Sequence, residues 1–340
     1  MPSQASSQNR PVIVCDSLDR TFTVRHRAGL LRRRRVDVAA VAGVSFTVQA
    51  GEMVGYLGPN GAGKSTTIKM ITGILTPTGG RVETLGLEPI RRRTELTRRL
   101  GVVFGQRTQL WWDLPLADSF ELLHHVYRTD RRRHDANVAT FVELLNLGPF
   151  MATPVRQLSL GQRMRGELTA ALLHDPALVV LDEPTIGLDV VSKHAVRDFL
   201  VELNRDRGTT VLLTTHDLDD VERLCQRMMI IDHGRVIHDG SVDGFKATYG
   251  THRRVVVDLA EPAAPLTVPG ASVEKVDGPR QWLSFDRRET TAAAVVAGVV
   301  AVAAVHDLSI EEPDIEELVH QVYTAPRDPA GDGDRSGTVP

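Results

Sequence analysis

Short apolar runs recur along the first two thirds of the chain, and segments with helical periodicity separate them. The segment "VSFTV" at 44–48 alternates apolar and polar residues, which is the period of a strand with one buried face. Other runs are almost continuously aliphatic or β-branched, as in strands buried inside a parallel sheet. They cover 52–58, 101–105, 177–183, 209–216 and 227–232. Because helical patterns alternate with these strands, residues 11–245 are predicted to form an α/β domain.

Two further regions depart from this alternation. Residues 116–174 contain no convincing strand pattern and are predicted to form a helical lobe inserted into the α/β domain. Residues 250–324 contain strand patterns, a helix rich in alanine and valine, and a final short helix, so a small α+β accessory domain is predicted there. We expect residues 1–10 to be a flexible N-terminus and 325–340, rich in Pro, Gly and Asp, to be a disordered tail.

Composition places the chain among globular proteins and excludes several other classes. Hydrophobic residues make up 42% of the 340 residues and charged residues 24%, which is typical of a soluble protein with a core. The net charge of −3 gives no reason to expect nucleic acid as a partner. Cys15 and Cys225 lie far apart and in no metal-ligand spacing, so a reducing cytoplasm is expected.

The chain is expected neither to carry a signal peptide nor to span a membrane. The first ten residues lack the apolar core of a signal peptide. The segment "AAAVVAGVVAVAAV" at 292–305 falls short of the roughly 20 apolar residues that a spanning helix needs. It is predicted to be a helix that packs on a sheet and runs into a strand.

The segment "GPNGAGKST" has the spacing of a phosphate-binding loop, in which two glycines frame four residues before Lys and Ser. Glycines let backbone N–H groups turn toward a phosphate chain, and the helix predicted to begin near Lys64 adds the positive end of its dipole. Lys64 is expected to reach the terminal phosphates and Ser65 to ligate Mg²⁺. The residues expected to bind ATP are Gly58, Pro59, Asn60, Gly61, Ala62, Gly63, Lys64, Ser65 and Thr66.

Three polar residues stand where predicted strands end: Asp182, Glu183 and His216. In open α/β sheets, ligands bind at the carboxyl ends of the strands. Two adjacent carboxylates there are hard to explain by packing, because burial is costly for both charges. We expect Asp182 to hold Mg²⁺ and Glu183 to be the general base that activates water. His216 is expected to sense or stabilise the γ-phosphate, although a lone histidine is often structural.

A second candidate anion site lies at 157–168, "QLSLGQRMRGEL". Ser159 is a natural N-cap, and Gly161 stands where a loop becomes a helix. Free N–H groups at such a helix start favour an anion by roughly 0.3–1 kcal/mol. An ordinary capped helix explains the same residues and is the commoner case, so these residues alone leave both interpretations open.

In their order and spacing, "GPNGAGKST", "LSLGQ", "LDEPTIGLD" and "TTH" resemble the motifs of the ATP-binding subunit of ABC transporters, over residues 11 to about 245. The resemblance implies a P-loop ATPase core of ABC type with an antiparallel β subdomain and a helical lobe, here followed by a small C-terminal α+β appendage. It also implies that Gln106 is the Q-loop residue beside the metal and the attacked phosphate, that Asp189 belongs to the D-loop, and that Phe22 stacks on adenine.

The resemblance gives the second anion site a role as well. In that family two subunits pack head to tail around two ATP, so that the signature of one subunit contacts the nucleotide in the P-loop of the other. Ser159, Gly161 and Gln162 would make these contacts. Leu160 departs from the family signature LSGGQ, in which a glycine stands at this position. Because Ser159 and Gly161 are retained, we expect both sites of a homodimer to hydrolyse ATP.

The resemblance further implies that ATP hydrolysis powers a separately encoded membrane-spanning partner from the cytoplasmic face of the membrane, with a second copy or a paralogue as the other ATPase. The extension ending in "DLSIEEPDIEEL" and the phrase "GQRTQLWWDLP" resemble ATPases that serve ABC-2-type exporters. Trp111 and Trp112 then lie where the permease docks, as adjacent anchors. The alternative is that both tryptophans belong to the core.

Two other functions deserve comparison with transport. A soluble ABC-type ATPase acting on nucleic acid or ribosomes usually carries two ATPase domains or long insertions, and the sequence has neither. A nucleotide-binding regulator without turnover would lack the general base, yet Glu183 is present. The sequence therefore favours a transport ATPase.

Overall fold

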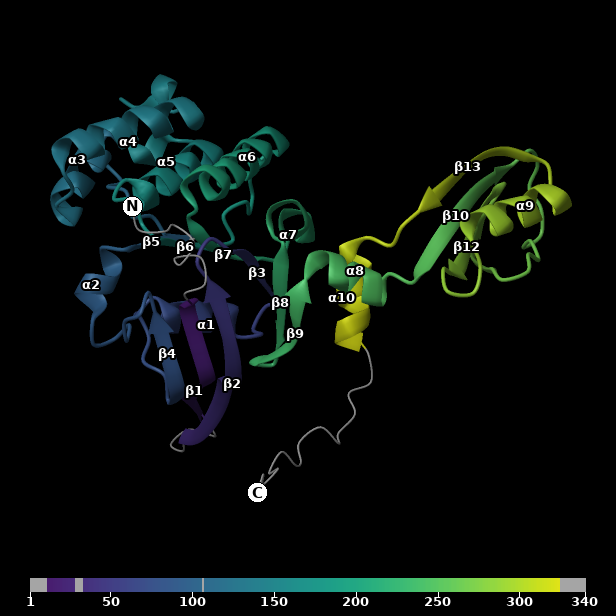
Figure 1. The fold of residues 1–340 in the computed structure, drawn as a ribbon, viewed down its shortest axis with the longest axis horizontal. Helices are drawn as coiled ribbons and strands as arrows, with labels where there is room; N and C mark the ends of the chain where they lie inside the picture. The colour runs from purple at the N-terminus through teal and green to yellow at the C-terminus, as the bar shows by residue number, and fades with distance from the viewer. Residues whose placement is uncertain (1–10, 28–32, 106, 325–340) are drawn as a thin grey trace, which may run out of the picture. The chain divides into compact units, whose positions relative to one another are not determined.

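The computed structural model describes residues 11–27, 33–105 and 107–324 (Figure 1). The predictions for the N-terminal segment 1–10, the tail 325–340 and Gln106 lie outside the described residues. The chain divides into two compact units, Met1–Val242 and Asp243–Pro340, which are described separately.

A six-stranded sheet in the order β5-β6-β7-β3-β8-β9 forms the centre of the first unit (Figure 1). Its strands are β3 (Met53–Leu57), β5 (Leu100–Phe104), β6 (Leu178–Asp182), β7 (Thr210–Thr215), β8 (Arg227–Asp232) and β9 (Arg235–Ser241). The first five pair in parallel, whereas β9 at the edge runs antiparallel. Every residue of β3 and β7 is buried, which explains their aliphatic and β-branched composition. The predicted buried strands are confirmed.

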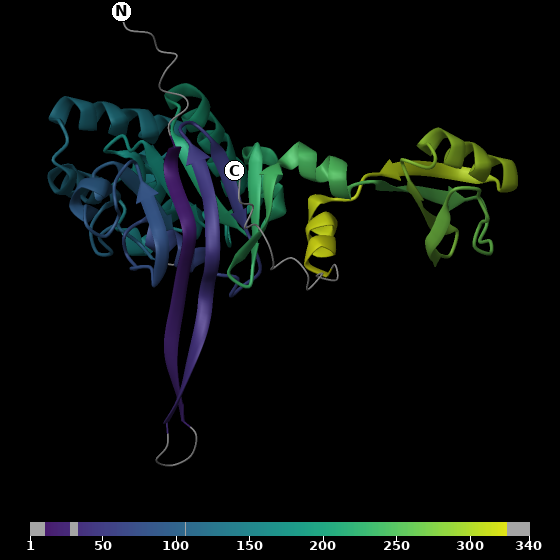
Figure 2. The same cartoon turned by 60° about the horizontal axis from the view of Figure 1, so that its bottom comes forward.

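A three-stranded antiparallel sheet in the order β2-β1-β4 completes the strands of this unit. It consists of β1 (Pro11–Arg27), β2 (Arg33–Gln49) and β4 (Gly79–Thr84). β4 pairs with β1 only from Ile13 to Asp19, while β1 and β2 stay paired as far as Arg27 and Arg33. The two strands therefore continue as a ribbon beyond β4 (Figure 2). The strand predicted at 44–48 covers only a small part of β2.

Helix α1 (Lys64–Ile71) joins the two sheets through a common apolar core. Its Ile68 and Ile71 are fully buried in the same cluster as Ile13 of β1 and Tyr56 of β3. Interiors of this kind are close-packed and resist displacement. Since α1 directly follows the phosphate loop, this packing fixes the position of the loop.

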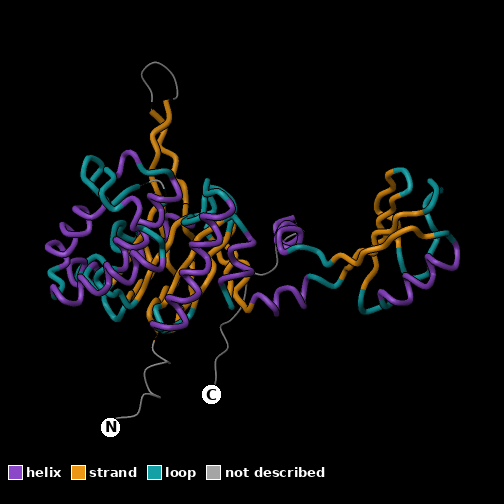
Figure 3. The backbone as a smooth tube through the Cα atoms, turned by 90° about the horizontal axis from the view of Figure 1, so that it is seen from above, coloured by secondary structure: helices purple, strands orange, loops and turns teal. Residues whose placement is uncertain are grey.

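Helices occupy the segment between β5 and β6, as predicted for 116–174. The main ones are α3 (Leu116–Tyr127), α4 (Arg131–Leu144) and α5 (Leu160–Leu172), with short 3-10 turns at Gly148–Phe150 and Val155–Gln157. Figure 3 shows this lobe as helices and loops without a strand among its described residues. The remaining helices of the unit are α2 (Arg93–Thr97), α6 (Val190–Arg207) and α7 (Leu218–Leu224).

The second unit contains a four-stranded antiparallel sheet in the order β11-β12-β10-β13. Its strands are β10 (His252–Leu259), β11 (Ser272–Asp277), β12 (Arg280–Asp286) and β13 (Val305–Glu311), and its helices are α8 (Val242–Tyr249), α9 (Ala292–Val302) and α10 (Ile315–Thr324). Val295 and Val299 of α9 pack against Val255 and Leu283 on one face of the sheet. Strand β11 is mostly exposed and had no clear apolar pattern, so it was not predicted. Among the described helices, none has the length and apolar character to cross a bilayer.

His174 is an unusual residue of the first unit, because it is a buried histidine just beyond α5. Its ring stacks on Tyr127 with centroids 3.9 Å apart, and Nε2 lies 3.2 Å from the carbonyl oxygen of Leu100. That carbonyl can only accept, so Nε2 carries the proton and Nδ1 is bare and without a partner. Burial lowers the pKa of His174 to about 4.

The lowered pKa of His174 predicts a loss of stability in mild acid. Between pH 6.5 and 4, His174 is protonated in the unfolded chain but neutral in the folded chain. Folding stability therefore falls as the pH falls through this window. From pH 7 to pH 5 this residue should cost about 2 kcal/mol of unfolding free energy. Urea unfolding of the parent and of His174→Gln, which keeps a donor for Leu100, measures the difference. Parallel pH dependence of the two proteins would contradict the prediction.

Candidate active site

The loop between β3 and α1 is enclosed by backbone on two sides. A Cβ at Gly58 would collide with the carbonyl oxygen of Ile231 in β8, and one at Gly63 with that of Ala40 in β2. Gly63 also has a φ of 109°, which favours glycine. Helix α1 starts directly after Gly63, and no side chain caps its first N–H groups. These N–H groups are therefore available to an anion such as a phosphate.

Lys64, the first residue of α1, is buried, and its ammonium group bonds to the loop. Nζ donates to the carbonyl oxygen of Gly58 and, at 3.2 Å, to that of Pro59. Burial lowers the pKa of Lys64, while the charges of Glu183 and Asp182 oppose this shift. The ammonium group thus donates to neutral carbonyl oxygens of the loop. Charged phosphate oxygens would form stronger hydrogen bonds with the same N–H groups.

Asp182 ends β6, and its carboxylate lies beside the start of α1. Oδ1 accepts a hydrogen bond of 2.5 Å from Thr214 Oγ1 in β7, and Oδ2 lies 3.4 Å from Ser65 Oγ. A hydroxyl and a carboxylate are oxygen ligands that suit Mg²⁺, which usually takes one or two protein ligands together with substrate phosphates. The described residues contain no group of three His, Cys, Asp or Glu that would hold a metal alone. The pair therefore fits a magnesium ion that nucleotide phosphates also ligate.

Glu183 directly follows Asp182 and has a strained backbone. Its φ is 55°, a region that residues other than glycine seldom adopt, and its N–H donates to the carbonyl oxygen of Thr214 at 2.9 Å. Its Oε1 lies 3.2 Å from Nδ1 of His216, which follows β7. Strain of this kind persists only when the surrounding structure enforces it. The carboxylate and the imidazole thus meet at the edge of the sheet where the phosphate loop lies.

A buried charged group fixes the segments that carry Glu183 and His216. Asp220 of α7 is 0% exposed, and its carboxylate accepts from Thr185 Oγ1 and, at 2.5 Å, from Arg197 Nε of α6. Thr185 is two residues beyond Glu183, and Asp220 is four residues beyond His216. A buried ion pair with its hydrogen bonds satisfied is costly to rearrange, so it holds both segments in one geometry.

Asp217, directly after His216, is tied to the same helix. It accepts a hydrogen bond of 2.6 Å from Lys193 Nζ and lies 3.6 Å from Arg197. Burial favours its neutral form, but the hydrogen bond from Lys193 and the two positive charges lower its pKa below the ordinary value. The segment after β7 is thus anchored to α6 at two points.

A cleft of about 390 Å³ opens at this edge of the sheet. Its walls include Asn60, Ser65, Phe104, Arg107, Asp182 and Glu183. Gly105 also lines the cleft, and a Cβ at this position would stand 3.0 Å from the carbonyl oxygen of Asp182. The next residue along the chain, Gln106, is outside the described residues. The cleft therefore collects predicted phosphate, metal and base residues in one place.

The predicted signature residues form a second cluster with Asp189. Ser159 caps α5 by accepting from the N–H of Gln162 at 3.2 Å, and Gln162 Oε1 accepts from the N–H of Ser159 at 2.9 Å. Gly161 is buried, and it lies so close to Ser192 in the first turn of α6 that a Cβ at position 161 would collide with it. Asp189 caps α6 by accepting from the N–H of Ser192 at 2.9 Å, which lowers the pKa of its carboxyl group.

Leu160 turns toward its own chain. A Cβ at Gly187 would stand 2.9 Å from Leu160 Cδ2, so the leucine side chain packs against the backbone of the segment that leads to Asp189. Gly187 also has a φ of 69°, a conformation that favours glycine. The leucine therefore leaves the capping side chain of Ser159 exposed.

Phe22 lies in β1 opposite Val38 of β2 and is half-buried. Two residues beyond Val38, the carbonyl oxygen of Ala40 reaches Gly63 of the phosphate loop. The guanidinium of Arg20 lies 4.6 Å from the centroid of the Phe22 ring. The β1–β2 pairing therefore brings an aromatic ring into the neighbourhood of the loop.

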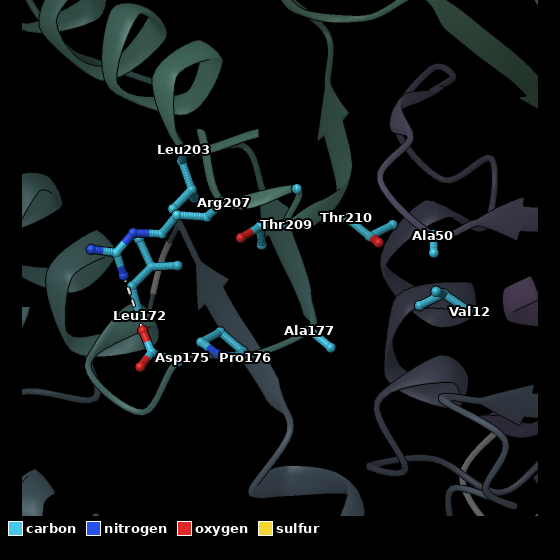
Figure 4. Close-up of a pocket in the computed structure, with 11 residues that line it drawn as sticks. Val12, Ala50, Leu172, Asp175, Pro176, Ala177, Leu203, Arg207, Thr209 and Thr210 are labelled. Carbon is cyan, nitrogen blue, oxygen red and sulfur yellow. Dashed lines mark hydrogen bonds and ion pairs between the residues drawn. The ribbon is translucent and has the colours of Figure 1, made fainter. Parts of the chain in front are cut away.

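Another cavity, of about 440 Å³, lies at the amino ends of the strands (Figure 4). Pro176 and Ala177 before β6 and Thr209 before β7 contribute to it, and Arg207 bonds Asp175 at 3.0 Å in its wall. Because strands β6 and β7 run in parallel, this cavity lies at the opposite ends of the strands from Asp182 and His216. None of the predicted site residues lines it.

This fold and site define a P-loop nucleotide triphosphatase. The family model described as ABC transporter matches residues 41–186. The chain is 34% identical over 294 residues to the daunorubicin resistance ATP-binding protein DrrA3 of Streptomyces coeruleorubidus, an alignment that covers 84% of this chain and 92% of that protein. It is 40% identical over 205 residues to the Nod factor export ATP-binding protein I of Rhizobium meliloti (strain 1021), covering 60% of each.

Solved structures agree with these sequence relatives. A dimeric post-hydrolysis state of the ATP-binding cassette MJ0796, bound to ADP and Pi, matches with a TM-score of 0.57 and 25% identity, and covers 68% of this chain and 98% of that one. The chain belongs to the ATP-binding subunits of ABC transporters. It is an ATPase, and the related cassette MJ0796 forms a dimer.

Several residues of the site were not predicted from the sequence. Thr185 and Thr214 lie within "LDEPTIGLD" and "TTH" but were given no role, and Arg197 and Asp220 belong to no motif identified above, yet all four position the acidic pair. One signal existed for Asp220, because it shares the buried face of α7 with Val221 and Leu224. A carboxylate on an apolar helix face is expected to have a specific buried partner.

Removal of the Thr185 hydroxyl should slow hydrolysis while leaving ATP binding intact. Thr185→Val deprives Asp220 of one hydrogen bond and frees the segment after Glu183, whereas the phosphate loop is untouched. We expect kcat to fall about tenfold, equivalent to about 1.4 kcal/mol, with KM for ATP unchanged. Thr185→Ser keeps the hydroxyl and should behave as the parent does. Equal kcat for the Val and Ser variants would contradict a positioning role.

Proposed function

We propose that the phosphate loop, Asp182, Glu183 and His216 form one half of an ATP-hydrolysing site that uses Mg²⁺. The observation that carries this proposal is the meeting of Lys64, Ser65, Asp182 and Glu183 at one edge of a parallel sheet. Uncapped N–H groups of α1 lie at the same edge, and they favour a polyphosphate.

Each residue has a distinct task in this mechanism. The N–H groups of the loop and the Lys64 ammonium bind the phosphates and balance charge as it develops on the terminal group. Ser65 and Asp182 hold Mg²⁺, which when bound polarises the phosphoryl oxygens. Glu183 accepts the proton of the attacking water. His216 senses or stabilises the γ-phosphate, and its 3.2 Å contact with the Glu183 carboxylate holds the two groups together. Phe22 stacks on adenine, and Gln106 contributes beside the metal.

The second cluster supplies the other half of the site to a second subunit. Ser159, Gly161, Gln162 and Asp189 are proposed to face the ATP held in the partner's phosphate loop. This is supported by apolar side chains at the same surface: Leu160 and Ile186 are partly exposed, and Val190 and Val191 are 70% and 79% exposed. Exposed apolar residues gathered around polar ones are typical of an association surface. With Leu160 turned toward Gly187, both sites of a homodimer are proposed to hydrolyse ATP.

The work done by hydrolysis is proposed to be export through a separately encoded ABC-2-type permease, from the cytoplasmic face of the membrane. The export function named for the Nod factor protein, and the match to DrrA3 across both units, support this. Trp111 and Trp112 are 38% and 48% exposed beside the cleft segment, which favours a docking role over a place in the core.

Glu183→Gln should bind ATP normally, accumulate as an ATP-bound dimer and hydrolyse at least about 100-fold more slowly, because an amide cannot take the proton of water. Single-turnover hydrolysis and sedimentation with ATP and Mg²⁺ measure both effects. Lys64→Ala is the control for the loop, since it should lose ATP binding itself. Turnover by Glu183→Gln at the parent rate would exclude Glu183 as the base.

Detergent purification of the tagged protein from its native cells should recover a polytopic membrane protein in stoichiometric amount. Replacement of Trp111 and Trp112 by Ala should lower that recovery at least about tenfold, because exposed tryptophans commonly dominate an interface. Hydrolysis by the purified protein should be unchanged. Recovery of ribosomes or DNA instead, or full recovery of the membrane protein by the double variant, would contradict the export proposal or the docking site, respectively.

A further inference from the structure

Glu167 is a buried acid that the proposed mechanism does not use. It lies in the middle of α5 and is 4% exposed. Arg163, one turn earlier in α5, acts on its carboxylate as an attractive charge, but Glu167 has no ion pair among the described residues. Burial raises the pKa of Glu167, and the hydrogen bonds that it accepts oppose this shift. An acid in such a position costs stability unless its hydrogen bonds are satisfied.

The bonds to Glu167 all come from one short segment that follows the cleft. Oε1 accepts from Thr108 Oγ1, and Oε2 accepts from the N–H of Gln109 at 3.2 Å. Gln109 Nε2 in turn donates to the backbone carbonyl of Glu167 at 3.1 Å. A carboxylate satisfied by several donors of one segment fixes that segment against the helix.

Close packing reinforces these bonds. A Cβ at Gly166 would stand 2.9 Å from Leu116 Cδ1 and 3.3 Å from Leu110 Cδ1, so α5 approaches the segment 108–116 closely. The same segment carries the exposed Trp111 and Trp112. The guanidinium of Arg163 in α5 lies 5.7 Å from the centroid of the Trp112 ring. The backbone carbonyl oxygen of Trp112 accepts a hydrogen bond of 2.9 Å from the N–H of Arg156.

Helix α5 therefore has contacts of two kinds along its length. Its first turn presents Ser159 and Gln162 at the surface proposed for the second subunit. Two turns further, Glu167 binds the segment with the tryptophans. A continuous helix moves as a rigid body over so short a distance, so a displacement of its first turn is passed on to what Glu167 holds.

We propose that Glu167 is a positioning residue that transmits closure of the ATP-bound dimer from the start of α5 to Trp111 and Trp112. The inference rests on the proposed function, since closure requires ATP between two subunits. Glu167→Leu would break the transmission, because the leucine side chain has no acceptor for the Thr108 hydroxyl or the Gln109 N–H.

The three tryptophans of the chain make a direct test possible. Trp282→Phe leaves Trp111 and Trp112 as the reporters, and Glu183→Gln in the same chain traps the ATP-bound dimer. In this background, quenching of tryptophan emission by acrylamide should change on addition of ATP and Mg²⁺. Glu167→Leu should lose that change, while ATP affinity and dimer formation stay as in the parent.

Two further variants make the result specific. Thr108→Val removes one donor to Glu167 without altering the buried acid, and it should also lose the change. Glu143→Leu makes the same chemical change at an exposed site of the lobe, and it should keep the fluorescence change. If Glu167→Leu and Thr108→Val both retain the full change, or if the parent dimer forms with no change, the inference is overturned. If the parent neither binds ATP nor dimerises, the proposed function fails, and this inference with it.

Discussion

The parallel pairing of β6, β7 and β3 is the constraint on which the site depends. In this register Asp182 lies opposite Thr214, and Leu57, the last residue of β3, lies opposite Thr215. The glycine loop, the carboxylate of Asp182 and the segment with His216 therefore leave the sheet at neighbouring points, at the carboxyl ends of the strands. No long-range search by flexible loops is needed to bring them together, because backbone hydrogen bonds between buried strands set their spacing.

The rest of the first unit holds the segments that follow these strands in fixed positions. The loop is enclosed between β2 and β8, and α1 is anchored in the core shared by the two sheets. The segment after Asp182 is held by Thr185 and Asp220, and it continues through Gly187 to Asp189 at the start of α6. One stretch of seven residues, 183–189, thus connects the cluster proposed to hydrolyse ATP to the cluster proposed to face a second subunit.

Much of this could be read from the sequence, since motif spacing reflects the backbone itself. Buried strands, the glycine loop and the Ser159 cap depend on local chemistry, and the structure places them as predicted. The full length of β1 and β2 could not be predicted, because their distal parts are rich in arginine and pair only with each other beyond β4. The partners of Asp220 and Glu167 could not be predicted either. Each acid stands on an apolar helix face, but the donors come from segments distant in sequence, and only tertiary packing selects them.

The contact between Leu160 and Gly187 has a consequence for how these two positions can vary over evolutionary time. With leucine at 160, a side chain at 187 would have to displace the exposed leucine tip, which stands 2.9 Å from the position of a Cβ there. A small residue at 160 would remove this steric conflict but not the conformational cost, since φ at 187 is 69°. The two positions are therefore coupled: glycine at 187 lets leucine at 160 keep its present contact, whereas another residue at 187 would require the leucine to move.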